Sequence, residues 1–381
     1  MLHLRGFPYP NNLSSTPKCH LLLLKPHSFT FFSIAAAAAT TTSDSDKKSF
    51  TISYLTNNFG LSPQDALKVS KRFTFETPEK PNSVITFFKT QGFSDHQIQS
   101  IIRRNHQLIL SNPIKTILPK LQFLASKGAS PTDIVATVTR SPYFLTSSSL
   151  KRIIQTFELV RTFCPSNKKA IAIIIVCPTL FRDLRMKPNL QFLLVSGVNR
   201  SGIYFLLRSR PFVFCYTDMR KAVEEIKELG FDPSKFKFCV ALLAKRTVAK
   251  SQWDAKVDAL KSWGCSEDVI FYAFKIQPNF MLRSPDKLNA VMQFWVKELE
   301  WDPSVLFAAP DLFGCSLEKR LVPRASVVRY LLSKGLMKKS ASLRTPFSLT
   351  EELFMEKYVD CYEEEEASKL LRLYQGKDAS I

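Results

Sequence analysis

The chain has 381 residues, of which 45% are hydrophobic, so it is long and apolar enough to bury a core, and wholesale disorder is excluded. Its 53 lysine and arginine residues against 33 aspartate and glutamate residues give a formal net charge of +20. A surplus of that size indicates a polyanionic partner, nucleic acid or an anionic membrane, with a basic surface that serves only solubility as the simpler alternative.

Residues 1–46 have the composition of an organellar transit peptide and linker. They contain three basic residues, many serine, threonine and alanine residues, and no acidic residue before Asp44. A secretory signal fits poorly because Pro8, Pro10 and Pro17 interrupt the start, and the apolar runs are shorter than the ~20 residues of a membrane span. We therefore expect no membrane association, and import into the mitochondrion or, as the alternative, the chloroplast. The remaining residues keep 50 basic against 31 acidic side chains.

Catalytic and metal-binding residues are scarce. The eight cysteines include no C-x-x-C pair and mostly lie in apolar runs, so they indicate reduced, buried side chains and no zinc site or disulfide framework. Beyond residue 46 the histidines are His96 and His106. No phosphate-binding loop, dinucleotide fingerprint, zinc-protease motif or hydrolase elbow is present. We expect no enzyme, no cofactor, no metal and no small-molecule substrate.

A proline followed by an apolar, Leu/Phe-rich ending recurs along the chain, as in Arg208–Phe214. The gaps between these prolines are 36, 33, 67 and 32 residues, which a unit of about 34 residues explains if one unit has lost its proline. The prolines are Pro142, Pro178, Pro211, Pro278 and Pro310. Glycines follow the same frame at intervals of 32 to 36 residues, with Cys164 and Glu300 in two of the places: Gly60, Gly92, Gly128, Gly197, Gly230, Gly264 and Gly335. Such a period predicts a solenoid.

Each unit predicts two helices and a turn. A proline in the first helical turn and a glycine after the last turn mark the two ends of a first helix of about nine to eleven residues, as in residues 81–92, 119–128 and 188–197. A capping residue then opens the second helix, which must end before the next proline, and the residues after that proline predict a short 3₁₀ turn. The predicted caps are Ser62, Ser130, Asp232, Ser266 and Asp302.

No alternating β pattern occurs, so we predict an all-α fold, a right- or left-handed α-solenoid of about eight to nine repeats over residues 47–335. Residues 317–335 predict the first helix of a final repeat. Residues 336–381 predict C-terminal capping helices and a tail, with closing helices over 347–362 and 367–374. Glu363–Glu366 predict a solvated acidic first turn of the final helix.

Several stretches carry a family resemblance. They are the repeat ending itself, Ser53–Leu55 with Gly60–Pro63, Phe75–Pro81, and the end motifs Arg320–Arg324, Ser333–Leu336 and Tyr374–Lys377. Over residues 50–377 the chain resembles plant mitochondrial transcription termination factor (mTERF) family proteins. The resemblance implies an organellar solenoid that binds nucleic acid and affects transcription termination or initiation, or RNA processing such as intron splicing. The end motifs resemble the mitochondrial branch.

The sequence departs from the family pattern at some repeats. The unit that ends at residues 244–250 lacks its proline, His106-Gln107 stands where another unit would have it, and two units have no arginine before the proline. We therefore do not expect every repeat to contact a ligand.

Basic residues recur at or just after the end of the second helices, where a solenoid presents one equivalent position per repeat to the phosphates of a nucleic acid. The predicted nucleic-acid-binding residues are Arg103, Arg104, Arg140, Arg208, Arg210, Lys245 and Arg246, with Lys250, Arg283, Arg182 and Arg185, which follow just after those helix ends, as second choices. The alternative is that these cations complement the dipoles of their helices.

The aromatic residues of the turns predict packing between repeats rather than base stacking: Phe144, Phe181, Phe212, Phe214, Phe280 and Phe313. We expect the same of Trp253, Trp263, Trp295 and Trp301.

We expect a monomer that binds organellar DNA or RNA, with double-stranded DNA favoured, and that regulates transcription termination. The alternatives are an organellar RNA-processing factor and a protein-binding scaffold. Pentatricopeptide and tetratricopeptide arrays share the period, but neither expects the recurrent proline ending.

Overall fold

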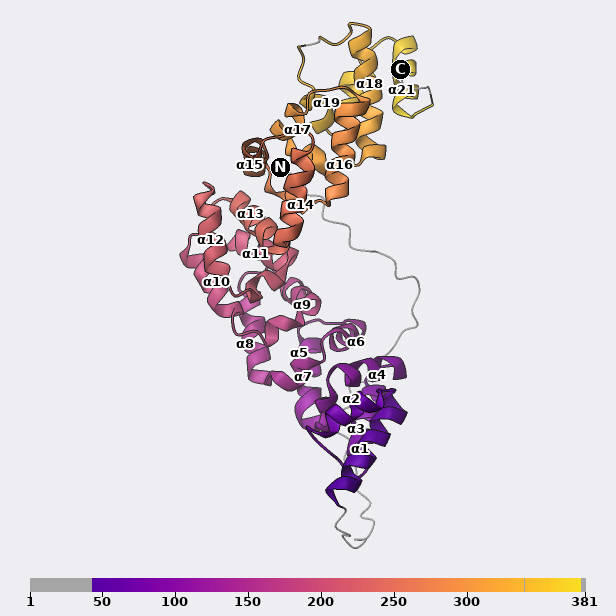
Figure 1. Ribbon diagram of the computed structural model, residues 1–381, viewed down its shortest axis with the longest axis vertical. Coiled ribbons are helices and arrows are strands. Elements are labelled where there is room, and N and C mark those ends of the chain that lie inside the picture. Colours follow the sequence, from indigo (N-terminus) through magenta and orange to yellow (C-terminus); the bar gives the residue numbers. More distant parts are fainter. Residues whose placement is uncertain (1–42, 339, 378–381) are drawn as a thin grey trace. The chain divides into compact units, whose positions relative to one another are not determined.

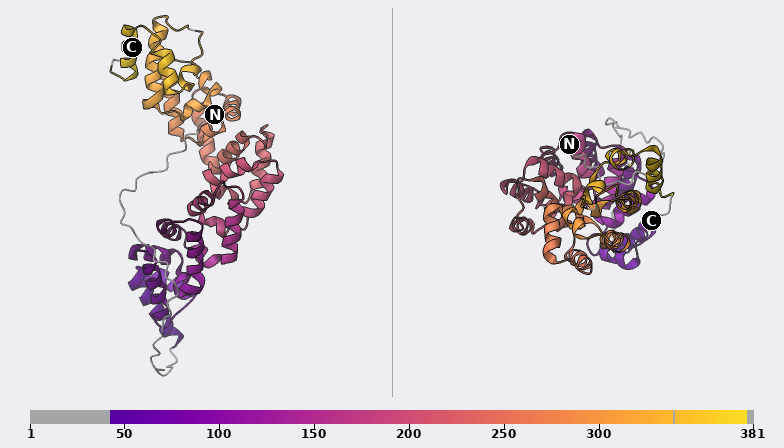
Figure 2. Two further views of the ribbon diagram at one scale, coloured as in Figure 1. Left: turned by 180° about the vertical axis from the view of Figure 1, so that it is seen from behind. Right: turned by 90° about the horizontal axis from the view of Figure 1, so that it is seen from above.

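The computed structural model describes residues 43–338 and 340–377. Within these ranges every regular element is helical and no strand occurs, as the ribbons of Figures 1 and 2 show. The all-α prediction is therefore confirmed. The predicted transit peptide lies almost entirely outside the described residues, and the first helix begins at Asp44 with a capping box formed by Ser43 and Asp46.

The chain divides into two compact units. The first ends at Leu184 and the second begins at Arg185, and each is described by itself.

In the first unit, the second helices of successive repeats contact one another, α4 with α6 and α6 with α9, while the first helices α5 and α8 contact each other in a separate layer. This is the two-layer packing of a helical-repeat array. The elements are α1 (Asp44–Phe59), α2 (Pro63–Ser70), α3 (Glu79–Thr90), α4 (Asp95–Arg104), η1 (His106–Leu110), η2 (Pro113–Ile117), α5 (Leu118–Ser126), α6 (Pro131–Arg140), α7 (Tyr143–Ser147), α8 (Leu150–Arg161), α9 (Asn167–Val176) and η3 (Pro178–Phe181).

The second unit repeats the arrangement, with α10 against α12 in one layer and α11 against α13 in the other. Its elements up to residue 298 are α10 (Met186–Val195), α11 (Arg200–Ser209), η4 (Pro211–Cys215), α12 (Met219–Glu228), α13 (Phe236–Thr247), α14 (Lys250–Lys261), α15 (Glu267–Ile276), η5 (Pro278–Leu282), α16 (Pro285–Gln293) and η6 (Phe294–Glu298). The remaining elements are α17 (Ser304–Ala308), η7 (Pro310–Gly314), η8 (Leu317–Leu321), α18 (Val322–Ser333), α19 (Arg344–Ser348), α20 (Glu351–Tyr358) and α21 (Glu364–Tyr374).

The glycine frame marks the ends of the first helices. All seven framed glycines have positive φ angles, from 60° at Gly60 to 96° at Gly128 and Gly197. Glu300, which fills a vacant place in the frame, is the single non-glycine residue with positive φ among the described residues, at 56°. The left-handed conformation is thus kept at Glu300, whereas Cys164, in the other vacant place, does not have a positive φ.

The second helices end as predicted, one residue before the turn. Ser141, Arg210 and Gln277 leave helical geometry with φ angles of −144°, −152° and −146°. A proline follows each of them, which disfavours helical geometry in the preceding residue. A single helical turn then follows, as in η4 and η5. The unit without its proline has no such turn, because α14 begins three residues after α13 ends.

Two predicted caps are wrong. Asp232 and Asp302 do not open second helices, since α13 starts at Phe236 and α17 at Ser304. Instead, Oδ1 of Asp232 accepts a hydrogen bond from the Ser234 N–H at 2.9 Å, and Oδ1 of Asp302 accepts one from Ser304 at 2.8 Å. Each aspartate therefore stabilises a local turn ahead of the helix. Ser62, Ser130 and Ser266 cap as predicted.

Polar side chains of the first helices bond to the turn at the end of the same repeat. The Asn189 amide donates to Phe214 O at 2.9 Å and to Tyr216 O at 2.7 Å. Lys256 Nζ donates to Met281 O at 2.7 Å, and Lys120 Nζ donates to Leu145 O. These three donors lie eight residues before Gly128, Gly197 and Gly264. Each reaches a carbonyl 25 residues further along the chain.

Burial lowers the pKa of both Lys120 and Lys256. Burying these amines costs free energy, and their hydrogen bonds offset it because an unsatisfied buried carbonyl would itself cost about 1–3 kcal/mol. In the unit without a turn, the equivalent position is Ala222, which is buried and apolar. The donor is thus absent where the turn is absent. The equivalent places before turns η1 and η7 are also apolar, Val84 and Met292, so a turn can form without this donor.

The C-terminal elements close the second unit around a buried arginine. Arg324 on α18 is 0% exposed and donates to Pro346 O at 2.7 Å and Leu349 O at 2.8 Å. It also pairs with Glu351 at 3.1 Å. Beside it, α18, α20 and α21 share an apolar core that includes Leu331, Phe354 and Leu370. The polar bond from first helix to following turn is therefore kept in the closing module.

We expect Asn189→Ala to lower the free energy of unfolding by about 1–3 kcal/mol, because two turn carbonyls lose their donor. Chemical denaturation followed by circular dichroism measures this loss. The matched control is Gln191→Ala on the same helix, since Gln191 is exposed and makes no hydrogen bond within the described chain. Equal stability of the two variants would contradict the role assigned to the turn bond.

Candidate nucleic-acid interface

The predicted arginines of the first unit bond to the C-terminal carbonyls of neighbouring helices. Arg104, the last residue of α4, donates from Nη1 to Arg140 O at 2.9 Å, and Arg140, the last residue of α6, donates to Ile175 O on α9 at 3.1 Å. Arg103 donates to Phe59 O at 2.6 Å and to Gly60 O at 2.9 Å, at the end of α1. The series stops at α9, whose last residue is Val176.

These contacts place a positive charge against the negative end of each neighbouring helix dipole and satisfy carbonyls that have no partner within their own helix. The alternative explanation for the recurrent arginines therefore accounts for Arg103, Arg104 and Arg140, with the difference that each arginine acts on a neighbouring helix. All three remain exposed. Their role in phosphate binding stays a prediction.

Arg208 and Arg210 in the second unit are different. Arg208 lies in the last turn of α11 and Arg210 is the residue after that helix, and both are exposed. Neither side chain makes a hydrogen bond or an ion pair with any described residue. These two cations are thus available to an external anion.

An aromatic pair lies next to Arg210. The Phe212 and Tyr216 rings meet edge to face with centroids 5.5 Å apart, and the Arg246 guanidinium lies 4.3 Å from the Tyr216 centroid. Arg246 in turn forms an ion pair with Asp218 at 2.5 Å. We call Arg208, Arg210, Phe212, Tyr216 and Arg246 the arginine–aromatic cluster. It joins the ends of α11 and α13 within the second unit.

The other predicted cations are dispersed. Lys245 Nζ lies 4.4 Å from the Trp253 ring centroid, and Lys250 is the exposed first residue of α14. Arg283 follows η5 and lies against Gly314, where an added Cβ would come within 2.9 Å of its Nη2 atom. Arg182 lies over the Tyr143 ring at 5.3 Å, and its carbonyl accepts a bond from Arg152.

Five of the six turn aromatics are buried as predicted, and Phe212 is the exception. Phe144, Phe181, Phe214, Phe280 and Phe313 are at most 1% exposed, whereas Phe212 is 48% exposed. Phe212 directly follows the turn proline, and that place faces outward in other turns as well, since Tyr143 is 44% exposed. The prediction that Phe212 packs between repeats is wrong. In these turns the residue directly after the proline faces outward, whereas the second and third residues after the proline are buried.

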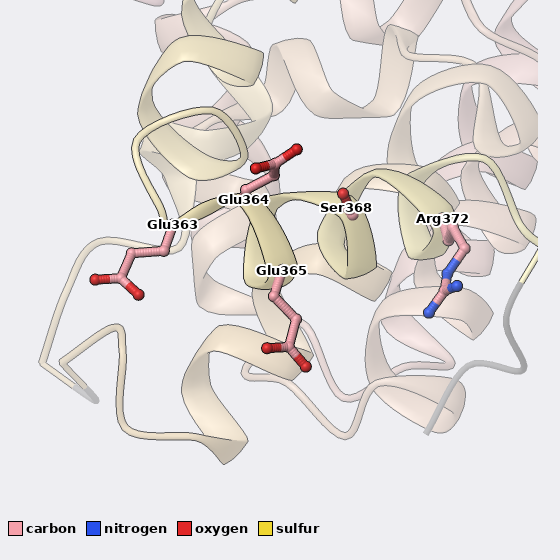
Figure 3. A pocket seen from close by; sticks show the side chains of 5 residues that line it. All are labelled: Glu363, Glu364, Glu365, Ser368 and Arg372. Carbon is pink, nitrogen blue, oxygen red and sulfur yellow. The ribbon is translucent and has the colours of Figure 1, made fainter.

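Metal-ligating side chains are not gathered into a site in the described part of the chain. It contains no group of three or more His, Cys, Asp or Glu side chains placed to hold a metal ion. Burial raises the pKa of Cys177 to about 11 and of Cys239 to about 12, so these thiols stay protonated near neutral pH. The acidic first turn of α21 is present, but Figure 3 shows the Glu363, Glu364 and Glu365 carboxylates pointing away from one another.

Membrane insertion has no candidate among the described helices, because none is both long and apolar enough to span a bilayer.

Two-helix repeats stacked in two layers, most of them closed by a turn and those of the first unit bonded to one another through helix-terminal carbonyls, define an α-solenoid protein. The mTERF family model matches residues 85–246 and 183–355, which together run from residue 85 to residue 355. The chain belongs to the mTERF family.

A curated relative is the mitochondrial transcription termination factor MTERF15 of Arabidopsis thaliana, which is 20% identical over 266 residues. The match covers 68% of this chain and 50% of the relative. The chain thus spans about half the length of this relative.

We expect Arg140→Ala to reduce the free energy of unfolding by about 0.5–1 kcal/mol, because the end of α9 loses a charged donor. Arg208→Ala is the matched control, since Arg208 is exposed, lies near the end of the corresponding helix and has no polar partner. Denaturation of both variants measures the difference. An Arg208 variant that is destabilised as much as the Arg140 variant would contradict this division.

Proposed function

We propose that this protein binds double-stranded DNA in an organelle, the mitochondrion by preference over the chloroplast, and regulates transcription termination without catalytic activity. The observation that supports this most directly is the pair Arg208 and Arg210, two exposed guanidinium groups without partners in a chain of formal charge +20. Membership of the mTERF family and the name of the Arabidopsis relative support the organellar and transcriptional assignment.

The arginine–aromatic cluster suits phosphate contacts. Guanidinium groups donate to phosphate oxygens in pairs, and the ion pair of Arg246 with Asp218 fixes the neighbouring aromatic residues without using Arg208 or Arg210. Contacts of this kind position a nucleic acid but carry no sequence information. Affinity from them is expected to fall steeply with salt as counterions are released.

For the double variant Arg208→Gln/Arg210→Gln, we expect weaker duplex binding. The slope of log binding constant against log salt concentration should become less steep by about 2, corresponding to two lost phosphate contacts. Fluorescence anisotropy of a labelled DNA duplex over a salt series measures both quantities. The loss should be similar for duplexes of different sequence.

The charge-matched control is Lys187→Gln/Lys297→Gln, which removes two exposed lysines of the first-helix layer. Its salt slope should stay close to that of the unmodified protein. If both double variants lose affinity equally, general surface charge explains binding and the assigned residues are wrong. If the unmodified protein shows no salt-dependent binding, the proposed function fails.

A second candidate function, processing of organellar RNA, is favoured by one observation. Phe212 is a half-exposed ring beside two unpaired arginines, and an exposed aromatic face next to cations is how many proteins hold unpaired bases. A duplex with all bases paired offers no such face. Single-stranded RNA would use the same cluster with Phe212 as an additional contact.

Phe212→Ala distinguishes the two candidates. If RNA is the ligand, single-stranded RNA affinity should fall roughly 10-fold, since stacking contributes about 1–3 kcal/mol per base, while duplex affinity changes little. Binding of both polymers to the variant is measured at one salt concentration. The control is Tyr272→Ala, which removes a ring that is 61% exposed on α15. Unchanged RNA binding in the Phe212 variant would exclude this use of the cluster.

A further inference from the structure

A small basic pocket lies in the first unit, apart from the arginine–aromatic cluster. It has a volume of about 440 Å³ and lies between α2 and the ends of α1 and α4. Its polar lining consists of Ser62, Asp65, Lys68, Arg72, Arg103 and His106, and Leu61 and Val69 contribute apolar surface. His106 begins η1, where other repeats place the turn proline.

Two of the lining groups have no polar partner among the described residues. The Arg72 guanidinium is exposed, the His106 imidazole is partly buried, and neither side chain makes a hydrogen bond or ion pair. They are close enough for Arg72 to oppose protonation of His106. Burial first, and then Arg72, lower the pKa of His106, while Asp65 acts in the opposite direction.

The remaining lining groups leave the pocket positive. Asp65 is satisfied by Lys68 at 3.0 Å and by the Ser62 hydroxyl at 2.8 Å, which hold the pKa of its carboxyl below the ordinary value. Arg103 uses Nε and Nη2 for the carbonyls of Phe59 and Gly60, so its Nη1 donors remain. The lining thus contains three cations, Lys68, Arg72 and Arg103, against the one carboxylate of Asp65, and protonation of His106 would add a further positive charge.

Arg103 is held rigidly in this position. Its guanidinium crosses directly over Gly60, where an added Cβ would lie 2.6 Å from Nη2. The two carbonyl bonds and this close approach fix the direction of the remaining Nη1 donors. A preorganised arginine of this kind loses little conformational freedom on binding an anion.

We propose that this pocket binds a phosphate group, held by Arg72, the Nη1 donors of Arg103 and His106. An oxyanion of tetrahedral shape satisfies three donors from different directions, and it would be further stabilised by protonation of His106. The phosphate belongs to a free anion, to the backbone of a nucleic acid or to the terminal phosphate of a strand. Placed in the first unit, the site is independent of Arg208 and Arg210.

Histidine NMR on the full chain tests the proposal with inorganic phosphate against chloride at equal ionic strength. Phosphate should raise the pKa of His106 because an anion favours the imidazolium form. His96, exposed on α4, is the internal control, and His106→Gln assigns the signal. If phosphate shifts the His106 titration no more than chloride does, the proposal is overturned.

Arg72→Gln and Lys71→Gln form a matched pair, since both residues are exposed and adjacent but only Arg72 lines the pocket. Arg72→Gln should weaken phosphate binding roughly 10-fold or more, as expected for the loss of a charge-assisted hydrogen bond, and Lys71→Gln should leave it nearly unchanged. Equal binding by the two variants would contradict the site.

Oligonucleotides identify the source of the phosphate. If a terminal phosphate occupies the pocket, a 5′-phosphorylated strand should bind more tightly than the 5′-hydroxyl strand, and Arg72→Gln should abolish the difference. If a backbone phosphate occupies it, Arg72→Gln should weaken both strands equally. If neither strand responds, a free anion is the ligand, and the NMR result alone decides the proposal. The phosphate titration remains informative even if the protein binds no nucleic acid.

Discussion

The geometry of three repeats depends on a hydrogen bond from a first-helix side chain to a carbonyl of the turn that ends the same repeat. The turn exists because a proline stops the second helix, and its apolar residues must be buried to join neighbouring repeats. Burial leaves its carbonyls without water, so a donor from within the protein has to reach them. Lys120, Asn189 and Lys256 supply that donor from the same place in three repeats.

Arginine serves two separate purposes in this chain. In the first unit, Arg104 and Arg140 are bonded to the ends of neighbouring helices and hold successive repeats together. In the second unit, Arg208 and Arg210 lie at similar places in the repeat but bond to nothing in the described chain. Recurrence in the sequence shows that the position matters in each repeat, and only the contacts separate packing from binding.

Most of the fold follows from the sequence because its signals are local. Proline and glycine act on their own backbone and that of their immediate neighbours, so the helix ends at Ser141 and Gly128 could be predicted from a few adjacent residues. The turn donors could not, because Asn189 and Phe214 are 25 residues apart and nothing near Asn189 indicates its partner. Phe212 was misassigned because composition cannot give the register of a short turn. The pocket around Arg72 and His106 combines residues from three helices. Its one signal in the sequence is His106, which stands where other repeats have the turn proline.

The repeat that has lost its turn also has Ala222 in place of the donor. A donor without a turn would be a polar group buried without a partner. A turn without this donor does occur, after Val84 and after Met292, so the dependence has one direction: the buried donor requires the turn, but the turn does not require the donor. A repeat that loses its turn is therefore expected to lose a buried lysine or asparagine at this place as well, whereas a repeat that keeps its turn can carry an apolar residue there.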